Sequence, residues 1–228
     1  MSKNRLNPAI RNYLLFYNIL SGVAWGFILF SATFHLLSGN PYSTLFELIG
    51  QPLLILVLIS LLEILHATLN FVNSGAGATA LQVLARLFAL YISNYGFKQD
   101  IVTKCFGFTV MVFAWSITEC IRYPYYALSL LDIDFYPILW ARYSLFYVLY
   151  PMGVWGEISQ VIRSLDLAYQ KSPNMYYFLV FMMVIYLPSF NSLYRHMVKQ
   201  RAKYIGASSA QPAKSAAASS KSTKAKKL

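Results

Sequence analysis

The chain contains, between Leu48 and Val72, the stretch L-I-G-Q-P-L-L-I-L-V-L-I-S-L-L-E-I-L-H-A-T-L-N-F-V, in which almost every side chain is apolar. About 20 apolar residues cross the hydrocarbon core of a bilayer as a helix, so this stretch predicts a membrane span. The same bias extends over the whole chain of 228 residues, of which 57% are hydrophobic and 12% are charged. A soluble domain carries about 25% charged residues. The excess apolar surface needs lipid as its solvent, which indicates a membrane protein.

Five further apolar segments of membrane length accompany this stretch. The six segments lie at residues 12–37, 48–72, 77–95, 101–128, 136–157 and 175–197. They predict an all-α fold, a bundle of six transmembrane helices within a domain of residues 1–205. The third segment is the weakest because it contains Gln82 and Arg86. The first segment follows a basic stretch but continues without a small-residue cleavage site, so we interpret it as a span and not as a signal peptide.

The net charge of +11 is concentrated at the two ends of the chain. Residues 1–11 hold Lys3, Arg5 and Arg11 with no acidic side chain. The last thirty residues also lack acids, and their basic residues are Lys199, Arg201, Lys203, Lys214, Lys221, Lys224, Lys226 and Lys227. Basic flanks of membrane helices stay on the cytosolic side. We therefore expect both termini in the cytosol, in agreement with an even number of spans.

Residues 206–228 read G-A-S-S-A-Q-P-A-K-S-A-A-A-S-S-K-S-T-K-A-K-K-L, a composition that cannot bury a core and predicts a disordered basic tail. Nucleic-acid binding is the rival interpretation, but this tail has no aromatic side chain on which bases could stack. Lys224 and Lys226 stand fifth and third from the end, a spacing that fits a dilysine retrieval signal of the endoplasmic reticulum. We expect a multi-pass protein of that membrane that does not bind nucleic acid.

Motifs that carry cofactors or metals in other proteins lack their context in this sequence. Residues 75–80, G-A-G-A-T-A, match a dinucleotide fingerprint but join two membrane segments and follow no strand. Glu63 and His66 have the spacing of half a di-iron carboxylate motif, whose partner motif is missing. Cys105 and Cys120 form no C-x-x-C pair. We expect neither a cofactor nor a metal.

Ionisable side chains within membrane segments are costly to bury, which makes them the first candidates for function. They are Glu63, His66, Arg86, Glu119, Arg122, Arg142 and Glu157. Glu119 and Arg122 are three residues apart and share a helix face, so the alternative is a pair that only neutralises its own charge. The same alternative applies to Glu63 and His66, with Arg86 from the next span as a candidate partner.

Residues 142–157 read R-Y-S-L-F-Y-V-L-Y-P-M-G-V-W-G-E and place Tyr143, Tyr150 and Glu157 on one stripe of a helix. A carboxylate against an apolar wall can carry a proton near neutral pH, and a nearby tyrosine can donate one. The alternative is an interfacial aromatic belt with a glutamate that reaches the membrane surface. A straight helix separates Tyr150 from Glu157 by about 10.5 Å. Unless Pro151 kinks the helix, the two side chains must flank a substrate without touching.

Five blocks of the sequence match one known family. They are Tyr17–Asn18, Leu62–His66, Gln82–Arg86, Ala114–Tyr123 and Arg142–Glu157. On these blocks the chain, over roughly residues 10–204, resembles the membrane 3-hydroxyacyl-CoA dehydratases of very-long-chain fatty-acid elongation, also called the protein-tyrosine-phosphatase-like family. The sequence departs from the family at residues 73–75, where Asn-Ser-Gly replaces the usual Arg-Ser-Pro.

The resemblance implies a hydro-lyase that removes water from a long-chain 3-hydroxyacyl-CoA to give the trans-2-enoyl-CoA, the third step of microsomal elongation. The family's catalytic tyrosine and glutamate fall on Tyr150 and Glu157, which we assign as acid and base, with the reverse assignment left open. The expected supporting residues, which would hold this pair or the thioester, are Arg142, Tyr143, Glu119 and Arg122.

The partners that the resemblance implies are the acyl-CoA substrate, membrane lipid and the other elongation enzymes. Coenzyme A is cytosolic, whereas the span count puts Glu157 toward the lumenal end of the fifth span. We therefore expect a pocket that opens to the cytosol and ends near Tyr150 and Glu157. The alternative function is a non-catalytic membrane scaffold or a small transporter, although a transporter would show internal symmetry that this sequence lacks.

Overall fold

The computed structural model describes residues 6–72, 75–92, 96–97 and 99–225, with only the backbone described at Leu187 and beyond Ile205. Within these ranges every regular element is a helix and none is a strand, which confirms the predicted all-α class. The helices are α1 (Pro8–Leu37), the 3-10 helix η2 (Tyr42–Thr44), α2 (Leu45–Ile59), α3 (Leu61–Thr68), α4 (Ala76–Tyr91), α5 (Asp100–Thr103), α6 (Phe106–Leu130), α7 (Tyr136–Ser144), α8 (Phe146–Lys171) and α9 (Pro173–Ala225).

Each of the six apolar segments falls on helix, but three of them are divided. The second is interrupted at Ser60, whose hydroxyl donates to the carbonyl of Val57 at 2.6 Å and so competes with the backbone ladder. The fourth divides into α5 and α6, and the fifth divides into α7 and α8 at Leu145.

Three helical stretches in the described part of the chain are long and apolar enough to cross a membrane. They are Pro8–Leu37, Tyr42–Thr68 and Pro173–Ile205. By length and composition these stretches are candidate membrane spans, which supports the predicted membrane class. This criterion selects three stretches and not the six that the sequence predicts, because the remaining described helices are shorter or carry more polar residues.

Helix α8 continues far beyond the predicted end of the fifth segment. The segment was expected to end at Glu157, whereas the helix runs on to Lys171, about 21 Å further along its axis. The hydropathy pattern ends early because Gln160 and Ser164 are polar, yet both are completely buried in the bundle. Glu157 therefore lies in the middle of a helix and not at its end, and its expected place near the lumenal end of a span stays a prediction.

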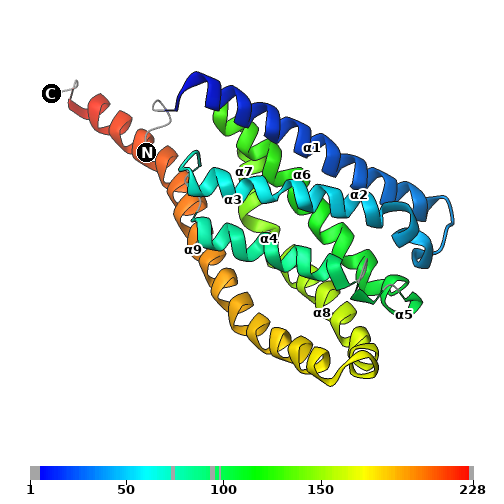
Figure 1. Cartoon of the computed structure of the whole chain (residues 1–228). Helices are drawn as coiled ribbons and strands as arrows, with labels where there is room; N and C mark the ends of the chain where they lie inside the picture. Colours follow the sequence, from blue (N-terminus) through cyan, green and yellow to red (C-terminus); the bar gives the residue numbers. More distant parts are fainter. Residues whose placement is uncertain (1–5, 73–74, 93–95, 98, 226–228) are drawn as a thin grey trace.

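Helix α6 is the centre of the bundle and packs against α1 on one side and α8 on the other. The approach of α6 and α8 is closest at two glycines, since a Cβ atom on Gly156 would lie 2.6 Å from the carbonyl oxygen of Gly107. Small residues allow such close backbone approach in membrane helices. Helix α9 packs on α8 and borders the opposite side of the molecule from α1 (Figure 1).

The start of α1 and the part of α9 before Ile205 lie at one end of the bundle, which we call the basic end (Figure 1). There Arg11 Nε donates to the carbonyl of Leu130 at 2.8 Å, and the ring of Tyr204 stacks on Tyr143 at 4.8 Å. The opposite end, called the distal end, holds Glu47 and Lys104, whose charged groups are 4.0 Å apart.

The backbone of α9 is helical through Ala225 and so continues into the segment for which composition predicts disorder. Alanine, the most frequent residue of this segment, is the strongest helix former, and the prediction considered only the missing core. The side chains beyond Ile205 are outside the described residues, as is Lys226 of the expected dilysine signal. The domain boundary at residue 206 and the disorder of the tail stay predictions.

Candidate active site

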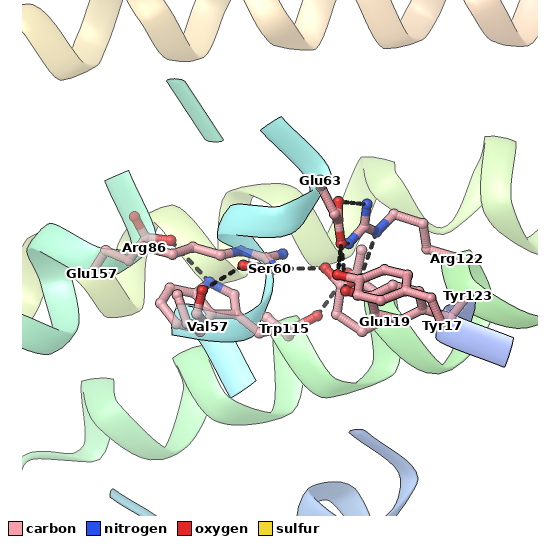
Figure 2. A network of polar contacts seen from close by, with 12 residues as sticks. Tyr17, Val57, Ser60, Glu63, Arg86, Trp115, Glu119, Arg122, Tyr123 and Glu157 are labelled. Carbon is pink, nitrogen blue, oxygen red and sulfur yellow. Dashed lines mark hydrogen bonds and ion pairs between the residues drawn. The ribbon is translucent and has the colours of Figure 1, made fainter. Parts of the chain in front are cut away.

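Two glutamates and two arginines form a buried ion-pair network between three helices (Figure 2). Arg122 on α6 binds both oxygens of Glu63 on α3, with its Nη1 and Nη2 at 2.6 and 2.8 Å. Its Nε donates to Glu119, one turn earlier on α6, at 2.6 Å. The other oxygen of Glu119 accepts a bond from Arg86 on α4 at 2.5 Å. Because the charges balance, the network tolerates burial.

Tyrosines on α1 and α6 complete the hydrogen bonding around Glu63. The hydroxyls of Tyr17 and Tyr123 both donate to its Oε1. His66, one turn later on α3, is bonded to the hydroxyl of Tyr13 at 2.9 Å and makes no ion pair in the described structure. The expected contact of Glu119 with Arg122 is present. Arg86, the candidate partner for Glu63 or His66, pairs with Glu119 instead.

A stacking contact joins this network to Glu157 on α8. The guanidinium of Arg86 lies 5.0 Å from the ring centroid of Trp115, within the range of a cation–π interaction. The indole Nε1 of Trp115 donates to Oε1 of Glu157 at 2.9 Å. The side chains of α4 and α6 therefore determine the position of the carboxylate on α8.

Glu157 is only 7% exposed, and both of its carboxylate oxygens accept hydrogen bonds. Oε1 accepts from Trp115, and Oε2 accepts from the hydroxyl of Tyr186 on α9. Hydrogen bonds to a buried carboxylate offset part of the cost of removing its charge from water. The two donors come from different helices, α6 and α9, and each binds a different oxygen, so they also determine the orientation of the group.

Tyr150 lies two turns before Glu157 on α8 and is held by aromatic rings of α9. Its ring stacks on Phe190 at 5.0 Å with an angle of 7° between the planes, and on Tyr194 at 6.4 Å. In the part of the chain that the structure describes, no hydrogen bond joins Tyr150 to Glu157. The two side chains are separate groups on one face of α8, as the spacing of seven predicts.

A cavity of about 970 Å³ runs along this face of α8, and both Tyr150 and Glu157 line it. Ligand pockets have volumes of about 300–1,000 Å³. The wall extends from Tyr204 at the basic end to Val161 near the middle of α8. The residues on it come from α1, α3, α4, α6, α7, α8 and α9, so the cavity occupies the interior of the bundle.

The four expected supporting residues lie in two separate places. Arg142 and Tyr143 line the cavity at the basic end, where the guanidinium of Arg142 stacks on Tyr125 and Tyr126 at 4.7 and 4.6 Å. Glu119 is completely buried and does not line the cavity. Its carboxylate is bound by Arg86 and Arg122. Arg122, which binds Glu119, does line the cavity. Among the described residues, none of the four forms a hydrogen bond, ion pair or ring contact with Tyr150 or Glu157. The supporting role of these four residues stays a prediction.

Comparison with known proteins assigns the chain to a family. A family model described as "Protein tyrosine phosphatase-like protein, PTPLA" matches residues 57–207, about two thirds of the sequence and nearly all of the cavity wall. The chain belongs to this PTPLA family. Mouse very-long-chain (3R)-3-hydroxyacyl-CoA dehydratase 2 is 36% identical over 211 residues, which cover 87% of this chain and 82% of the mouse protein.

The chain is also similar to proteins of a nematode and a plant. The dehydratase hpo-8 of Caenorhabditis elegans is 34% identical over 88% of this chain and 98% of its own length. The dehydratase PASTICCINO 2 of Arabidopsis thaliana is 31% identical over 89% of this chain and 97% of its own length. No solved structure matches the chain.

The PTPLA-family chain lacks the reactive loop of a phosphatase. That loop places an arginine six residues after its nucleophilic cysteine, but the residues six positions after Cys105 and Cys120 are Met111 and Tyr126. Cys105 is buried in the main hydrophobic core, and Cys120 packs against that core. Both cysteines therefore pack in or against the core.

Two side chains that contact Glu157 could not be identified as site residues from the sequence. Tyr186 lies 29 positions after Glu157 on another helix, and Trp115 lies 42 positions before it. No periodicity relates residues on different helices. For Tyr186 the local signal is a hydroxyl in a largely apolar segment, which the chain's 18 tyrosines share, and for Trp115 it is an indole N–H, which four tryptophans share.

Proposed function

We propose that this chain is a membrane 3-hydroxyacyl-CoA dehydratase of very-long-chain fatty-acid elongation. The observation that carries the proposal is the cavity in which Tyr150 and a doubly hydrogen-bonded Glu157 share one wall. The relatives that cover most of the chain are named as very-long-chain (3R)-3-hydroxyacyl-CoA dehydratases. A hydro-lyase of this class needs an acid and a base beside two adjacent carbons, and these side chains provide them.

In the proposed reaction, Glu157 removes a proton from C2 of the substrate. The electrons of that C–H bond form the C2–C3 double bond, and the hydroxyl on C3 leaves as water after it receives a proton from Tyr150. A positioned acid or base typically contributes about 10²–10⁴-fold to the rate. Trp115 and Tyr186 hold the carboxylate in place, so the base does not have to be ordered in each turnover.

The polarity of the cavity suggests how the substrate enters. Arg142 lines the basic end, donates a hydrogen bond to the hydroxyl of Tyr126 at 2.9 Å and forms no salt bridge in the described structure. A half-buried guanidinium without a carboxylate partner suits the phosphates or amides of coenzyme A. We infer that the thioester arm enters from the basic end and brings C2 and C3 to the level of Tyr150 and Glu157.

We further propose that the helical runs α1, α2–α3, α4, α5–α6, α7–α8 and α9 supply six membrane crossings. The start of α1 and the region before Ile205 lie at the same end of the bundle, which requires an even number of crossings (Figure 1). That end also holds the excess of basic residues, so it faces the cytosol by the positive-inside rule. The membrane is that of the endoplasmic reticulum, where other elongation enzymes are the partners.

The decisive experiment is an assay of the purified chain in detergent with a long-chain (3R)-3-hydroxyacyl-CoA. The proposal predicts a trans-2-enoyl-CoA product lighter than the substrate by one water, detected by mass spectrometry. A preparation with Glu157→Gln, which keeps the shape of the side chain, is the matched blank. Absence of product from well-folded wild-type protein would favour the scaffold alternative, and transport of the substrate without dehydration would favour the transporter.

A further inference from the structure

Helices α4 and α9 form facing walls of the cavity but scarcely touch each other. Helix α4 packs on α2 and α3, whereas α9 packs on α8 and α7. Their contact is at the distal end, where the rings of Phe88 and Phe178 meet edge to face at 6.1 Å. Between this contact and the basic end, both helices contribute residues to the cavity wall.

Large apolar side chains with high exposure lie along this edge of the cavity. Leu84 on α4 and Ile185 on α9 both line the cavity and are 54% and 42% exposed. Leu81 on α4 also lines it and is 49% exposed. In a bilayer, the outside of the bundle at this level is lipid. The edge is therefore an apolar connection between the cavity and the hydrocarbon of the membrane.

The distal end of the cavity gives a long acyl chain no room to continue. A cluster of buried side chains, among them Ile92, Val161 and Leu179, closes the bundle there. The polar part of an acyl-CoA would occupy the basic end, where Arg142 and Gln200 line the wall. A chain whose C2 and C3 lie beside Glu157 must leave the line of the cavity sideways.

We propose that the space between α4 and α9 is a lateral portal through which the hydrocarbon tail of the substrate extends into the bilayer. This inference rests on the proposed function and adds the path of the acyl chain. Carbons beyond the portal lie in lipid, so the enzyme accepts chains longer than its own cavity. The enzyme then discriminates by acyl-chain length only among chains that are too short to reach the portal.

Two neighbouring residues of α9 provide a matched test. Ile185 lines the cavity at the portal, whereas Val184 is 62% exposed and does not line it. Tryptophan at position 185 fills the portal, and tryptophan at position 184 points into lipid. The substrates are 3-hydroxyoctanoyl-CoA, whose tail ends inside the bundle, and 3-hydroxyhexacosanoyl-CoA, whose tail must pass the portal.

For Ile185→Trp we expect kcat/KM for the long substrate to fall about tenfold or more relative to the short one, the scale of a steric misfit in an apolar pocket. Val184→Trp should keep the wild-type ratio. An equal effect on both substrates, or an unchanged ratio in both Ile185→Trp and Leu84→Trp, overturns the portal. Wild-type protein that dehydrates neither substrate refutes the proposed function instead.

A second measurement decides the question if the tryptophan variants do not fold. A long 3-hydroxyacyl-CoA with a diazirine on its last carbon is bound to the wild-type protein in lipid nanodiscs and irradiated. The portal predicts that the label is found on the lipid or on the exposed edge near Leu84 and Ile185. Labelling confined to the distal cluster around Val161 and Leu179 overturns it.

Discussion

Replacement of Arg122 by methionine should destabilise the bundle more than it impairs the chemistry. Its guanidinium makes three hydrogen bonds, two to Glu63 and one to Glu119, and the side chain is only 14% exposed. With methionine at position 122, the buried carboxylates of Glu63 and Glu119 have only one arginine of the network left, Arg86. Removal of one partner of a buried ion pair costs about 3–5 kcal/mol. For a chain of this size, each kcal/mol lowers Tm by about 2–4 °C, so we expect a fall of about 6–20 °C.

The measurement is thermal unfolding in detergent, together with turnover at a temperature where the variant remains folded. Arg11→Met is the matched control, because Arg11 lies 3.7 Å from Asp132 in an exposed pair that contributes only about 0–1 kcal/mol. Adding Glu63→Gln to Arg122→Met removes one unpaired charge and should restore part of the Tm. If Tm falls no further than in Arg11→Met while turnover is lost, Arg122 acts on the substrate and the structural interpretation is refuted.

Four further predictions concern catalysis and topology. Tyr150→Phe and Glu157→Gln should each lower dehydratase turnover about 10²–10⁴-fold with normal expression, and full activity in both would defeat the assignment. Tyr186→Phe removes one of two donors to a charged group, worth about 1.5–3 kcal/mol, so kcat should fall about 10–100-fold with little change in KM; a change confined to KM would contradict a role through Glu157. Protease added to sealed microsomes should trim the C-terminal tail, whereas a protected tail would reverse the orientation. Serine at both Lys224 and Lys226 should weaken retention in the endoplasmic reticulum and leave activity in detergent unchanged, and an unaltered location would mean that the membrane spans determine residence.

Much of the architecture follows from local sequence patterns. The apolar segments predict the positions of the helices, because the length of each apolar segment must match the thickness of the bilayer. The spacing of Tyr143, Tyr150 and Glu157 places them on one face of a helix because helical periodicity depends on neighbouring residues alone. The pair of Glu119 with Arg122 was predictable for the same reason, since the two residues are one turn apart.

The ends of the helices were less predictable. Hydropathy marks where apolar residues stop, but α8 continues past Glu157 because Gln160 and Ser164 are buried against other helices. Burial of a polar side chain depends on what faces it across the bundle. The position of Glu157 in the middle of α8 therefore could not be deduced from hydropathy.

Only the tertiary structure decides which charged groups meet. Glu63 binds Arg122, 59 positions away, and Glu157 accepts hydrogen bonds from Trp115 and from Tyr186 on two other helices. The sequence by itself determines the membrane class, the helices and the Tyr150/Glu157 stripe, because each depends on residues a few positions apart. The ion-pair network, the donors to Glu157 and the cavity depend on the rotation and crossing of separate helices, which are set by the packing of the whole bundle.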